Sequence, residues 1–345
     1  MLGLPEEYYQ ALLDKNADYD GVFYVGVTTT GVFCRVTCTA RKPKFEHCQF
    51  YATTQAALDA GFRPCKRCHP LETETPAFVQ QLIEAVDAQP ERKWRAADFQ
   101  PFHTDASTVR RHFKRRFGLT FAEYVRARRM GLAVVQLQAG AAVIDAQIAS
   151  GYESGSGFRD AFSRLIGAPP TGAAARCLLY THWFETRLGQ MLAVGDEEHL
   201  LLLEFAHRRR LEREIAWLRR KTGAALVPGS SAPLRHIEAE LRAYFAGQLR
   251  GFSTPIRQIG SPFQMTVWSA LQTIPYGETV TYSAIAAHIA KPTAVRAVGS
   301  ANGANPLAII VPCHRVIGAD GALTGYGGGL PRKRWLLNHE QENLR

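Results

Sequence analysis

Several features that would assign the chain to a broad class are missing from its sequence. It has no uninterrupted apolar run of membrane-spanning length, and residues 1–20 are acidic and lack the basic-then-apolar pattern of a secretory signal. Seven cysteines in 345 residues are too few and too unevenly spaced for a disulfide scaffold. We find no solenoid repeat and no low-complexity tract. We therefore expect a cytoplasmic globular protein whose cysteines are metal ligands, nucleophiles or core residues.

The sequence does have an excess of positive charge, with a formal net charge of +10, and this charge is concentrated in two stretches. Residues 21–70 carry seven Lys or Arg against two acidic residues, and residues 91–130 carry eleven against four. A basic balance of this kind favours a polyanionic partner, most simply nucleic acid. A solvated basic face without a partner would give the same count.

The first basic stretch contains two closely spaced cysteine pairs. Three residues separate Cys34 from Cys38, and two separate Cys65 from Cys68. Each pair can bend back on a turn and present two thiolates to one ion, which is a ligand set of tetrahedral Zn²⁺. Because metal-bound cysteines are deprotonated, four thiolates and Zn²⁺ give a formal charge of about −2. The spacing predicts zinc, and it fits a purely structural site as well as a reactive one.

The segments around these pairs, TTGVFCRVTCTAR and FYATTQAALDAGFRPCKRC, resemble the amino-terminal domain of the Ada family of bacterial adaptive-response proteins. In that family the four cysteines bind zinc, and the first also accepts methyl groups from DNA phosphotriesters. The resemblance implies this role for Cys34, with Arg35 beside it at the DNA. Val36 and Thr37 replace the Pro-Ser of many relatives but remove no ligand. Methylation of Cys34 would change the site charge from about −2 to about −1, which predicts stronger DNA binding.

The second basic stretch belongs to a region that is predicted to be helical. Apolar side chains recur at helical spacing before Gly118 and again before Gly167, which predicts two helices that end at glycine. This paired arrangement resembles an AraC-type regulator domain with two helix-turn-helix units. Two helical hairpins with no role in DNA binding would also fit. The candidate helix caps are Ser107 and either Ser154 or Ser156, and the candidate DNA contacts are Arg110, Arg111 and Lys114.

Three residues weaken the base-reading faces that this resemblance would assign. Ala106, Gly157 and Asp160 offer little that could recognise bases. The sequence therefore favours DNA binding over the recognition of a specific promoter.

A third motif, VPCHRV at residues 311–316, places a cysteine beside a histidine after an apolar run. Alone it is a weak signal, because free cysteine is usually a small buried residue. It lies within residues 262–340, which closely resemble the O6-alkylguanine-DNA alkyltransferase family. The resemblance implies that Cys313 accepts the alkyl group irreversibly, that His314 acts through a water as its base, and that Glu340 orients this histidine.

The same resemblance implies roles for residues around the reacting cysteine. Asn305 would order the active-site turn, and Tyr282 would support nucleotide rotation and protonate the leaving guanine. Arg296 would fill the space of the flipped base from a second helix-turn-helix in the minor groove. Tyr326 would line the pocket in a glycine-rich loop, in which some relatives carry serine at the position of Gly327. Without the family, Arg296 would be an arginine on a solvated helix face.

Residues 178–205 alternate as strands do, and residues 208–222 predict an amphipathic helix that ends at Gly223. This part of the chain resembles the α/β subdomain that precedes the catalytic domain in alkyltransferases. The sequence offers no candidate site there.

We expect an α+β multidomain protein with a small four-cysteine zinc domain at residues 1–77 and an all-α AraC-like double helix-turn-helix domain at residues 78–172. An α/β subdomain at residues 173–258 would precede a mostly helical alkyltransferase domain, with its own helix-turn-helix, at residues 259–345. Zn²⁺ is the expected cofactor and double-stranded DNA the expected partner, with RNA polymerase as a further candidate, and we expect a monomer.

The predicted function is direct, suicidal repair of alkylated DNA by a methylated-DNA–protein-cysteine S-methyltransferase, coupled to methylation-dependent activation of transcription. Two alternatives stay open at the level of sequence. One is a repair-only enzyme whose other modules merely hold DNA. The other is a transcription factor with an inactive alkyltransferase remnant, against which the complete set of expected catalytic residues argues.

Overall fold

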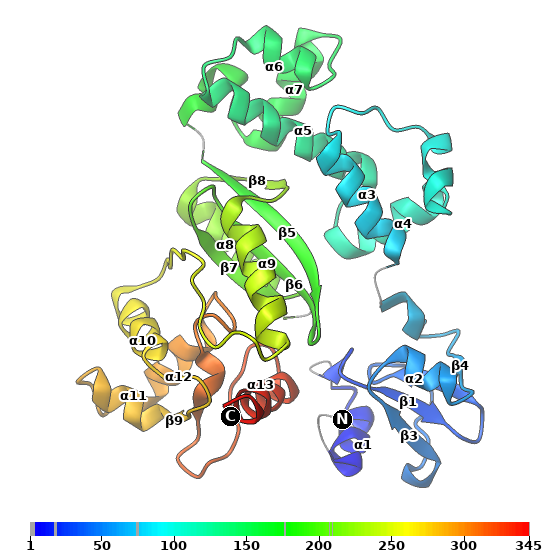
Figure 1. Ribbon diagram of the computed structural model, residues 1–345, viewed down its shortest axis with the longest axis vertical. Helices are drawn as coiled ribbons and strands as arrows, with labels where there is room; N and C mark the ends of the chain where they lie inside the picture. Colours follow the sequence, from blue (N-terminus) through cyan, green and yellow to red (C-terminus); the bar gives the residue numbers. More distant parts are fainter. Residues whose placement is uncertain are drawn as a thin grey trace.

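The computed structural model has the α+β organisation that the sequence predicts. A small sheet region at the amino terminus is followed by a set of helices, a larger sheet and a mostly helical carboxy-terminal region (Figure 1). Among the described residues, no helix combines the length and hydropathy needed to cross a membrane. The structure describes residues 4–16, 19–73, 76–175, 177–206, 208 and 210–344.

The amino-terminal region contains α1 (Pro5–Leu13), β1 (Tyr24–Val27), β2 (Val32–Arg35), β3 (Cys48–Tyr51), α2 (Thr54–Asp59) and β4 (Arg63–Pro64). Its sheet has the order β3-β1-β2-β4. β1 and β2 form a hairpin, and Gly31 in its turn has a φ of +63°, which glycine adopts without strain. β4 pairs parallel to β2, so that two segments far apart in sequence meet.

The helical region contains α3 (Ala77–Ala88), α4 (Ala106–Phe117), α5 (Phe121–Gln138), α6 (Val143–Ala149) and α7 (Gly155–Ile166). Gly118 and Gly167 end α4 and α7 in the left-handed conformation, as predicted. Ser154 caps α7 by accepting a hydrogen bond from the amide of Gly157. The prediction of Ser107 as the cap of α4 was wrong, because Asp105 lies two residues earlier and its carboxylate accepts from the amides of Ser107 and Thr108.

The larger sheet region contains β5 (Leu178–Thr186), β6 (Gly189–Gly195), β7 (Leu200–Phe205), α8 (Leu211–Thr222), β8 (Ala225–Pro228) and α9 (Ala232–Phe245). The strand order is β7-β6-β5-β8. Successive side chains of β6 face opposite sides of the sheet and belong to two hydrophobic cores. Met191 packs with α9, whereas Leu192 packs with α8. α9 begins inside residues 228–233, which the sequence predicts as a loop. Pro233 is compatible with a helix there because the first helical turn tolerates proline.

The carboxy-terminal region contains α10 (Pro262–Gln272), β9 (Val280–Thr281), α11 (Tyr282–His288), α12 (Val295–Gly303), β10 (Val316–Ile317) and α13 (Leu330–Glu342). It is joined to the larger sheet through the backbone of β7. The amide of Leu203 donates to the carbonyl of Pro306, and the amide of Ala308 donates to the carbonyl of Leu203, each at 2.8 Å. One hydrophobic core spans both regions, so the sheet positions the segment that leads to the VPCHRV motif.

Candidate active site and metal centre

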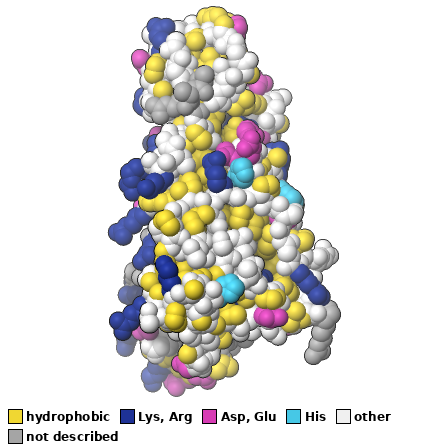
Figure 2. Space-filling view, turned by 90° about the vertical axis from the view of Figure 1, so that its left-hand side faces the viewer, with side chains coloured by type: hydrophobic (Ala, Val, Ile, Leu, Met, Phe, Trp, Pro, Cys, Tyr) yellow, Lys and Arg dark blue, Asp and Glu magenta, His cyan; other side chains and the backbone are white. Residues whose placement is uncertain are grey.

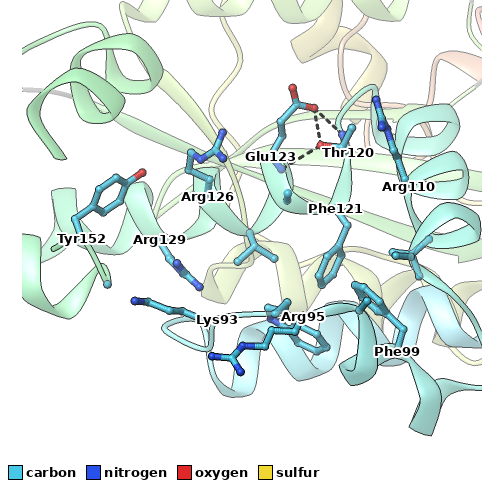
Figure 3. A pocket seen from close by; sticks show the side chains of 17 residues that line it. Lys93, Arg95, Phe99, Arg110, Thr120, Phe121, Glu123, Arg126, Arg129 and Tyr152 are labelled. Atoms are coloured by element: carbon cyan, nitrogen blue, oxygen red, sulfur yellow. Dashed lines mark hydrogen bonds between the residues drawn. The ribbon is translucent and has the colours of Figure 1, made fainter. Parts of the chain in front are cut away.

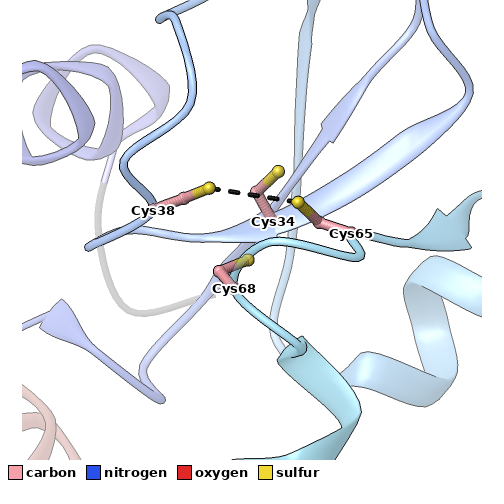
Figure 4. A group of neighbouring side chains, drawn as sticks. All are labelled: Cys34, Cys38, Cys65 and Cys68. Carbon is pink, nitrogen blue, oxygen red and sulfur yellow. Dashed lines mark hydrogen bonds between the residues drawn. The ribbon is translucent and has the colours of Figure 1, made fainter.

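The four cysteines of the two spaced pairs come together in the structure. Cys34 lies on β2, and Cys65 directly follows β4, whose pairing with β2 brings the two residues side by side. The sulfur atoms of all four cysteines lie within 4.8 Å of one another, and Cys38 Sγ is 4.0 Å from Cys65 Sγ (Figure 4). The pairing of two short strands, rather than a single local turn, assembles the cluster.

This cluster fits Zn²⁺. Tetrahedral zinc with Zn–S bonds of about 2.3 Å requires sulfur atoms about 3.8 Å apart, close to the 4.0 Å between Cys38 and Cys65. Backbone amides donate to three sulfurs at 3.4 to 3.5 Å, which favours thiolates over thiols. These amides belong to Arg35 (to Cys68), Ala40 (to Cys38) and Arg67 (to Cys65). The four cysteines that the sequence predicts as ligands lie together in one cluster, and this cluster supports the prediction of Zn²⁺ as the cofactor.

The cysteines differ in their access to solvent. Cys38 and Cys65 are buried, whereas Cys34 and Cys68 are partly exposed. The hydrogen bond between Cys34 and Cys68 lowers the pKa of the Cys68 thiol and raises the pKa of the Cys34 thiol. Arg35, which the resemblance places at the DNA, forms an ion pair with Asp20 but keeps 26% of its side chain exposed.

Cys313 begins a short 3-10 helix, Cys313–Arg315, and only 6% of the residue is exposed. The turn before it is held by Asn305, whose side-chain amide donates to the carbonyls of Leu307 at 3.1 Å and Val311 at 2.9 Å. The Asn305 side-chain oxygen accepts from the amide of Leu307 at 3.1 Å. All three hydrogen bonds are buried, so Asn305 fixes the course of the backbone that delivers Cys313.

The imidazole of His314 reaches Glu340 on α13. Its Nε2 is 2.8 Å from Glu340 Oε1, and both side chains are fully buried. Glu340 also accepts from Nε and Nη2 along one edge of the Arg315 guanidinium, from the hydroxyl of Tyr244 at 2.8 Å and from the amide of Gly277 at 3.0 Å. With Nε2 bonded to Glu340, the other ring nitrogen, Nδ1, is buried without a hydrogen-bond partner among the described residues. His314 can therefore accept a proton at Nδ1.

Burial and charge set the protonation states of this group. Burial lowers the pKa of His314 against the opposing effect of Glu340. The imidazole is therefore uncharged at neutral pH, and its Nδ1 is free to accept a proton. Burial alone would raise the pKa of Glu340, but His314 and Arg315 outweigh it and hold the pKa below its ordinary range. Burial raises the pKa of the Cys313 thiol, while Asn305 acts in the opposite direction. Cys313 thus rests as a thiol beside a neutral base.

Other predicted residues surround Cys313. The hydroxyl of Tyr282 donates to the carbonyl of Thr324 at 3.1 Å, which links α11 to the glycine-rich loop. Tyr326 lies in that loop with its ring centroid 6.4 Å from that of His314, and its buried hydroxyl has no partner among the described residues. Arg296 is exposed on α12. Figure 2 shows the face of the molecule on the side of α10 and α11, with Lys and Arg side chains spaced along one edge.

In the helical region, Arg110, Arg111 and Lys114 are exposed on α4. Near them a groove of about 840 Å³ lies between α4, the start of α5 and the turn before α7 (Figure 3). Among the described residues, no acidic side chain forms an ion pair with Arg95 or Arg126 in this groove. The groove is lined by aromatic rings, by one acidic side chain, Glu123, which accepts from the amide and hydroxyl of Thr120, and by five basic side chains. The rings are those of Trp94, Phe99, Phe121 and Tyr152, and the basic side chains are Lys93, Arg95, Arg110, Arg126 and Arg129.

Reasoning from the sequence missed four buried residues that support the reacting group. Tyr244 and Arg315 contact Glu340. Lys333 is fully buried, donates to the carbonyls of Val316 and Thr324, and has its pKa lowered by burial to about 8. Arg208 donates to the backbone near Asn305. Arg315 follows the Cys-His pair directly and Lys333 lies between the glycine-rich loop and Glu340, so both could have been found, whereas Tyr244 and Arg208 lie outside every motif.

Three family models match separate parts of the chain. Residues 7–71 match the metal binding domain of Ada, and residues 100–176 match a helix-turn-helix domain. Residues 262–342 match the DNA binding domain of 6-O-methylguanine DNA methyltransferase.

Relatives match along nearly the whole chain. The bifunctional transcriptional activator/DNA repair enzyme Ada of Escherichia coli is 32% identical, over 98% of this chain and 97% of its own length. The regulatory protein ada of Salmonella typhimurium is 33% identical, with the same shares of each chain covered. Among solved structures, Mycobacterium tuberculosis OGT in complex with DNA is 42% identical over 48% of this chain and 94% of that chain, with a TM-score of 0.42.

Proposed function

Because the chain belongs to the Ada family of transcriptional activators and DNA repair enzymes, we propose that Cys313 and Cys34 are its two methyl acceptors. The protein repairs DNA by transferring alkyl groups to its own cysteines, and it couples repair to the activation of transcription. The observation that carries the assignment of Cys313 is the fully buried His314–Glu340 pair, whose Nε2 to Oε1 distance is 2.8 Å. A cysteine that only filled space in the core would not need, next to it in the sequence, a buried histidine that is hydrogen-bonded to a buried glutamate.

Transfer to Cys313 begins with removal of its proton. The Nε2–H of His314 is held in a hydrogen bond to Glu340, so the Cys313 proton passes to the unpartnered Nδ1 through a bridging water. The thiolate sulfur then attacks the alkyl carbon of O6-alkylguanine. The S–C bond forms as the C–O bond breaks, and the leaving guanine takes up a proton. The product is a thioether, so each Cys313 reacts once.

The substrate atom reaches Cys313 only after the nucleotide leaves the base stack. Tyr282 and Tyr326 lie on the path into the pocket, and the Tyr282 hydroxyl is the proton donor for the leaving base. Arg296, exposed on α12, fills the space that the base leaves in the duplex. The small residues around it on α12 allow the helix backbone to approach the groove.

The zinc centre supplies the second acceptor. Cys34, Cys38, Cys65 and Cys68 hold Zn²⁺, which keeps the sulfurs deprotonated at neutral pH when bound. Cys34 is partly exposed and matches the family acceptor by position. Its sulfur takes the methyl carbon of a phosphotriester, and the C–O bond that breaks leaves an ordinary phosphodiester. The methylated site carries one negative charge fewer, which strengthens its binding to DNA.

DNA is the partner of all these modules, and the helical region binds it through α4 and the basic groove. Arg110, Arg111 and Lys114 face solvent on α4, where they can approach phosphates or base edges. An interaction with RNA polymerase, a monomeric state and a cytoplasmic location remain predictions. The domain limits at residues 77, 172 and 258 also remain predictions.

A labelling experiment tests both acceptors in one protein. Purified full-length protein is mixed with one duplex that carries labelled O6-methylguanine and another that carries a labelled methyl phosphotriester, and the modified peptides are mapped by mass spectrometry. We expect label from the base on Cys313 and label from the backbone on Cys34. Label on Cys313 alone would reduce the zinc site to a structural role, and label on neither would overturn the enzymatic assignment.

DNA binding before and after methylation tests the regulatory role. We expect protein methylated stoichiometrically at Cys34 to bind duplex DNA more tightly than unmethylated protein at the same salt concentration. Wild-type protein treated with the same duplex lacking the phosphotriester is the control, because Cys34 stays unmethylated while all four zinc ligands are kept. Equal affinities for methylated and unmethylated protein would favour a repair-only enzyme.

A further inference from the structure

Arg208 lies in the sheet region, outside every motif in the sequence. It follows β7, and its backbone amide donates to the carbonyl of Phe205 at 3.0 Å. Only 4% of its side chain is exposed, which is unusual for a residue that is charged at all physiological pH values. A buried guanidinium needs several partners to offset the loss of water, so its contacts identify what it holds in place.

The acidic partners of Arg208 come from its own region. Its Nη1 pairs with Glu204, whose side chain is 2% exposed, and its Nη2 is 3.0 Å from Glu214 Oε1 on α8. These two carboxylates fix the guanidinium relative to the sheet. The position of the guanidinium is therefore set by contacts within its own region.

From this position Arg208 reaches two backbone carbonyls of the carboxy-terminal region. Nη2 donates to the carbonyl of Gly303 at 2.8 Å, and Nη1 to that of Asn305 at 3.3 Å. Gly303 is the last residue of α12, which carries Arg296. Asn305 begins the turn that delivers Cys313. Arg208 thus ties the end of the DNA-contacting helix and the start of the active-site turn to β7.

The guanidinium also lies directly against the glycine-rich loop. A Cβ atom added to Gly327 would be 2.8 Å from Arg208 Cζ and 3.0 Å from its Nε, a separation that real Cβ atoms essentially never show. Gly327 is absent from the glycines with positive φ, so its backbone would accept another residue without strain. Space, and not backbone conformation, requires glycine at this position. Nε is buried without a hydrogen-bond partner among the described residues.

We propose that Arg208 is a positioning residue for alkyl transfer, and that residue 327 is glycine because the Arg208 guanidinium occupies the space of a side chain. The guanidinium supports the loop that carries Tyr326 on one side and the Asn305 turn on the other. Asn305 holds the backbone that leads to Cys313, and Tyr326 lies against His314, so Arg208 sets the spacing of both segments around Cys313 from outside the site. The inference rests on the proposed role of Cys313.

Two further facts support this role. The charge of Arg208 favours the Cys313 thiolate and so opposes the effect of burial on its pKa. A displacement of about 1 Å in an active site reduces the rate by about 100-fold. Because Arg208 directly contacts both the Asn305 turn and the Gly327 loop, a displacement of its guanidinium would also displace these two segments. Serine in place of Gly327 would require a different arrangement at residue 208.

A double-mutant cycle in the full-length, zinc-bound protein tests the proposal. The variants are R208M, G327A and R208M/G327A, assayed by single-turnover transfer from an O6-methylguanine duplex, with the DNA dissociation constant measured separately. We expect each single substitution to slow transfer at saturating DNA by about 10- to 100-fold with little change in DNA affinity. Because R208M removes the clash, G327A should cost less than about threefold in the R208M background.

The controls separate this proposal from folding and from the proposed function. G251A adds a Cβ where no atom lies within 4 Å, and R213M removes an exposed arginine of α8; both should transfer at the wild-type rate. Phosphotriester transfer to Cys34 in the same molecules reports that the rest of the chain is intact. If wild-type protein left Cys313 unlabelled, the proposed function would fail rather than this inference.

The outcome that overturns the inference is specific. Independent, multiplying effects of R208M and G327A would show that the two residues do not share one space. Should R208M fail to fold, R208K replaces it, since lysine keeps the charge but loses the planar contact with Gly327. A wild-type rate for G327A, or a wild-type rate for R208K with its DNA affinity unchanged, would also contradict the proposal.

Discussion

His314 and Glu340 form a hydrogen bond of 2.8 Å between two fully buried side chains that are 26 residues apart in the sequence. The carboxylate accepts from Arg315, Tyr244 and a backbone amide as well, so it cannot turn away from the histidine. This fixes His314 with its proton on Nε2 and its lone pair on Nδ1. The pair therefore makes His314 a base that is aligned before any substrate binds.

The first prediction concerns E340Q. Glutamine keeps the shape of Glu340 but removes the charge that orients His314 and pairs with Arg315. We expect alkyl transfer at saturating DNA to slow by about 100- to 10,000-fold and the free energy of unfolding to fall by about 3–5 kcal/mol. Single-turnover kinetics and urea unfolding measure the two effects. E342Q, exposed in the same helix, is the matched control, and an E340Q protein with wild-type kinetics would remove Glu340 from the mechanism.

The second prediction follows from the lowered pKa of Glu340. The unfolded chain takes up a proton at the ordinary glutamate pKa of about 4.3, whereas the folded protein does so only at lower pH. The stabilisation from Glu340 is thus complete above its ordinary pKa and is lost as pH falls toward the folded value. The difference in unfolding free energy between wild type and E340Q should stay constant from pH 7 down to about pH 5 and should shrink as pH falls further, below the ordinary glutamate pKa of about 4.3. Loss of metal in acid affects wild type and E340Q equally, so it cancels in the difference between their unfolding free energies. A difference that does not change with pH would contradict the lowered pKa of Glu340.

Some parts of this fold could be predicted because the signals are local. Gly118, Gly167 and Gly223 end their helices in the left-handed conformation as predicted, since helix termination depends on the residue at the cap. The four zinc ligands could be found from their spacing, because only a short turn separates the two cysteines of each pair. Local signals can also mislead, as in the prediction of Ser107 as the cap of α4. Asp105 lies two residues earlier, and its carboxylate accepts from the amides at the start of this helix.

Other parts have no local signal. Tyr244 reaches Glu340 across 96 residues and Arg208 reaches Asn305 across 97, and nothing in the segments around Tyr244 and Arg208 marks them as partners. These contacts exist because β7 bonds to the segment at Pro306–Ala308 and brings the two regions into one core. Contacts of this kind depend on tertiary structure. The resemblance to a family therefore predicts the candidate catalytic residues, whereas Tyr244 and Arg208, which support them, are apparent only from the structure.

The third prediction separates the zinc ligands from the other cysteine of that region. C38S removes a buried ligand, so we expect loss of the bound metal and rapid hydrogen exchange in the strands at residues 24–35. C48S is the matched control, because the Cys48 thiol donates only to the carbonyl of Lys44 and lies outside the cluster. Metal content and hydrogen exchange by mass spectrometry measure the outcome. Residues 262–342 should keep their protection in both variants, and retention of zinc by C38S would refute the four-cysteine site.

The fourth prediction concerns the basic groove of the helical region. Arg110 and Arg126 line it without ion pairs among the described residues, so each can neutralise one DNA phosphate. We expect R110A and R126A to weaken the binding of any duplex and to reduce the slope of log affinity against log salt by about 1 each. R213A, a charge-matched change on α8, should leave the slope unchanged. A loss of affinity confined to one sequence would instead place the altered arginine at base edges, because phosphate contacts carry no sequence information.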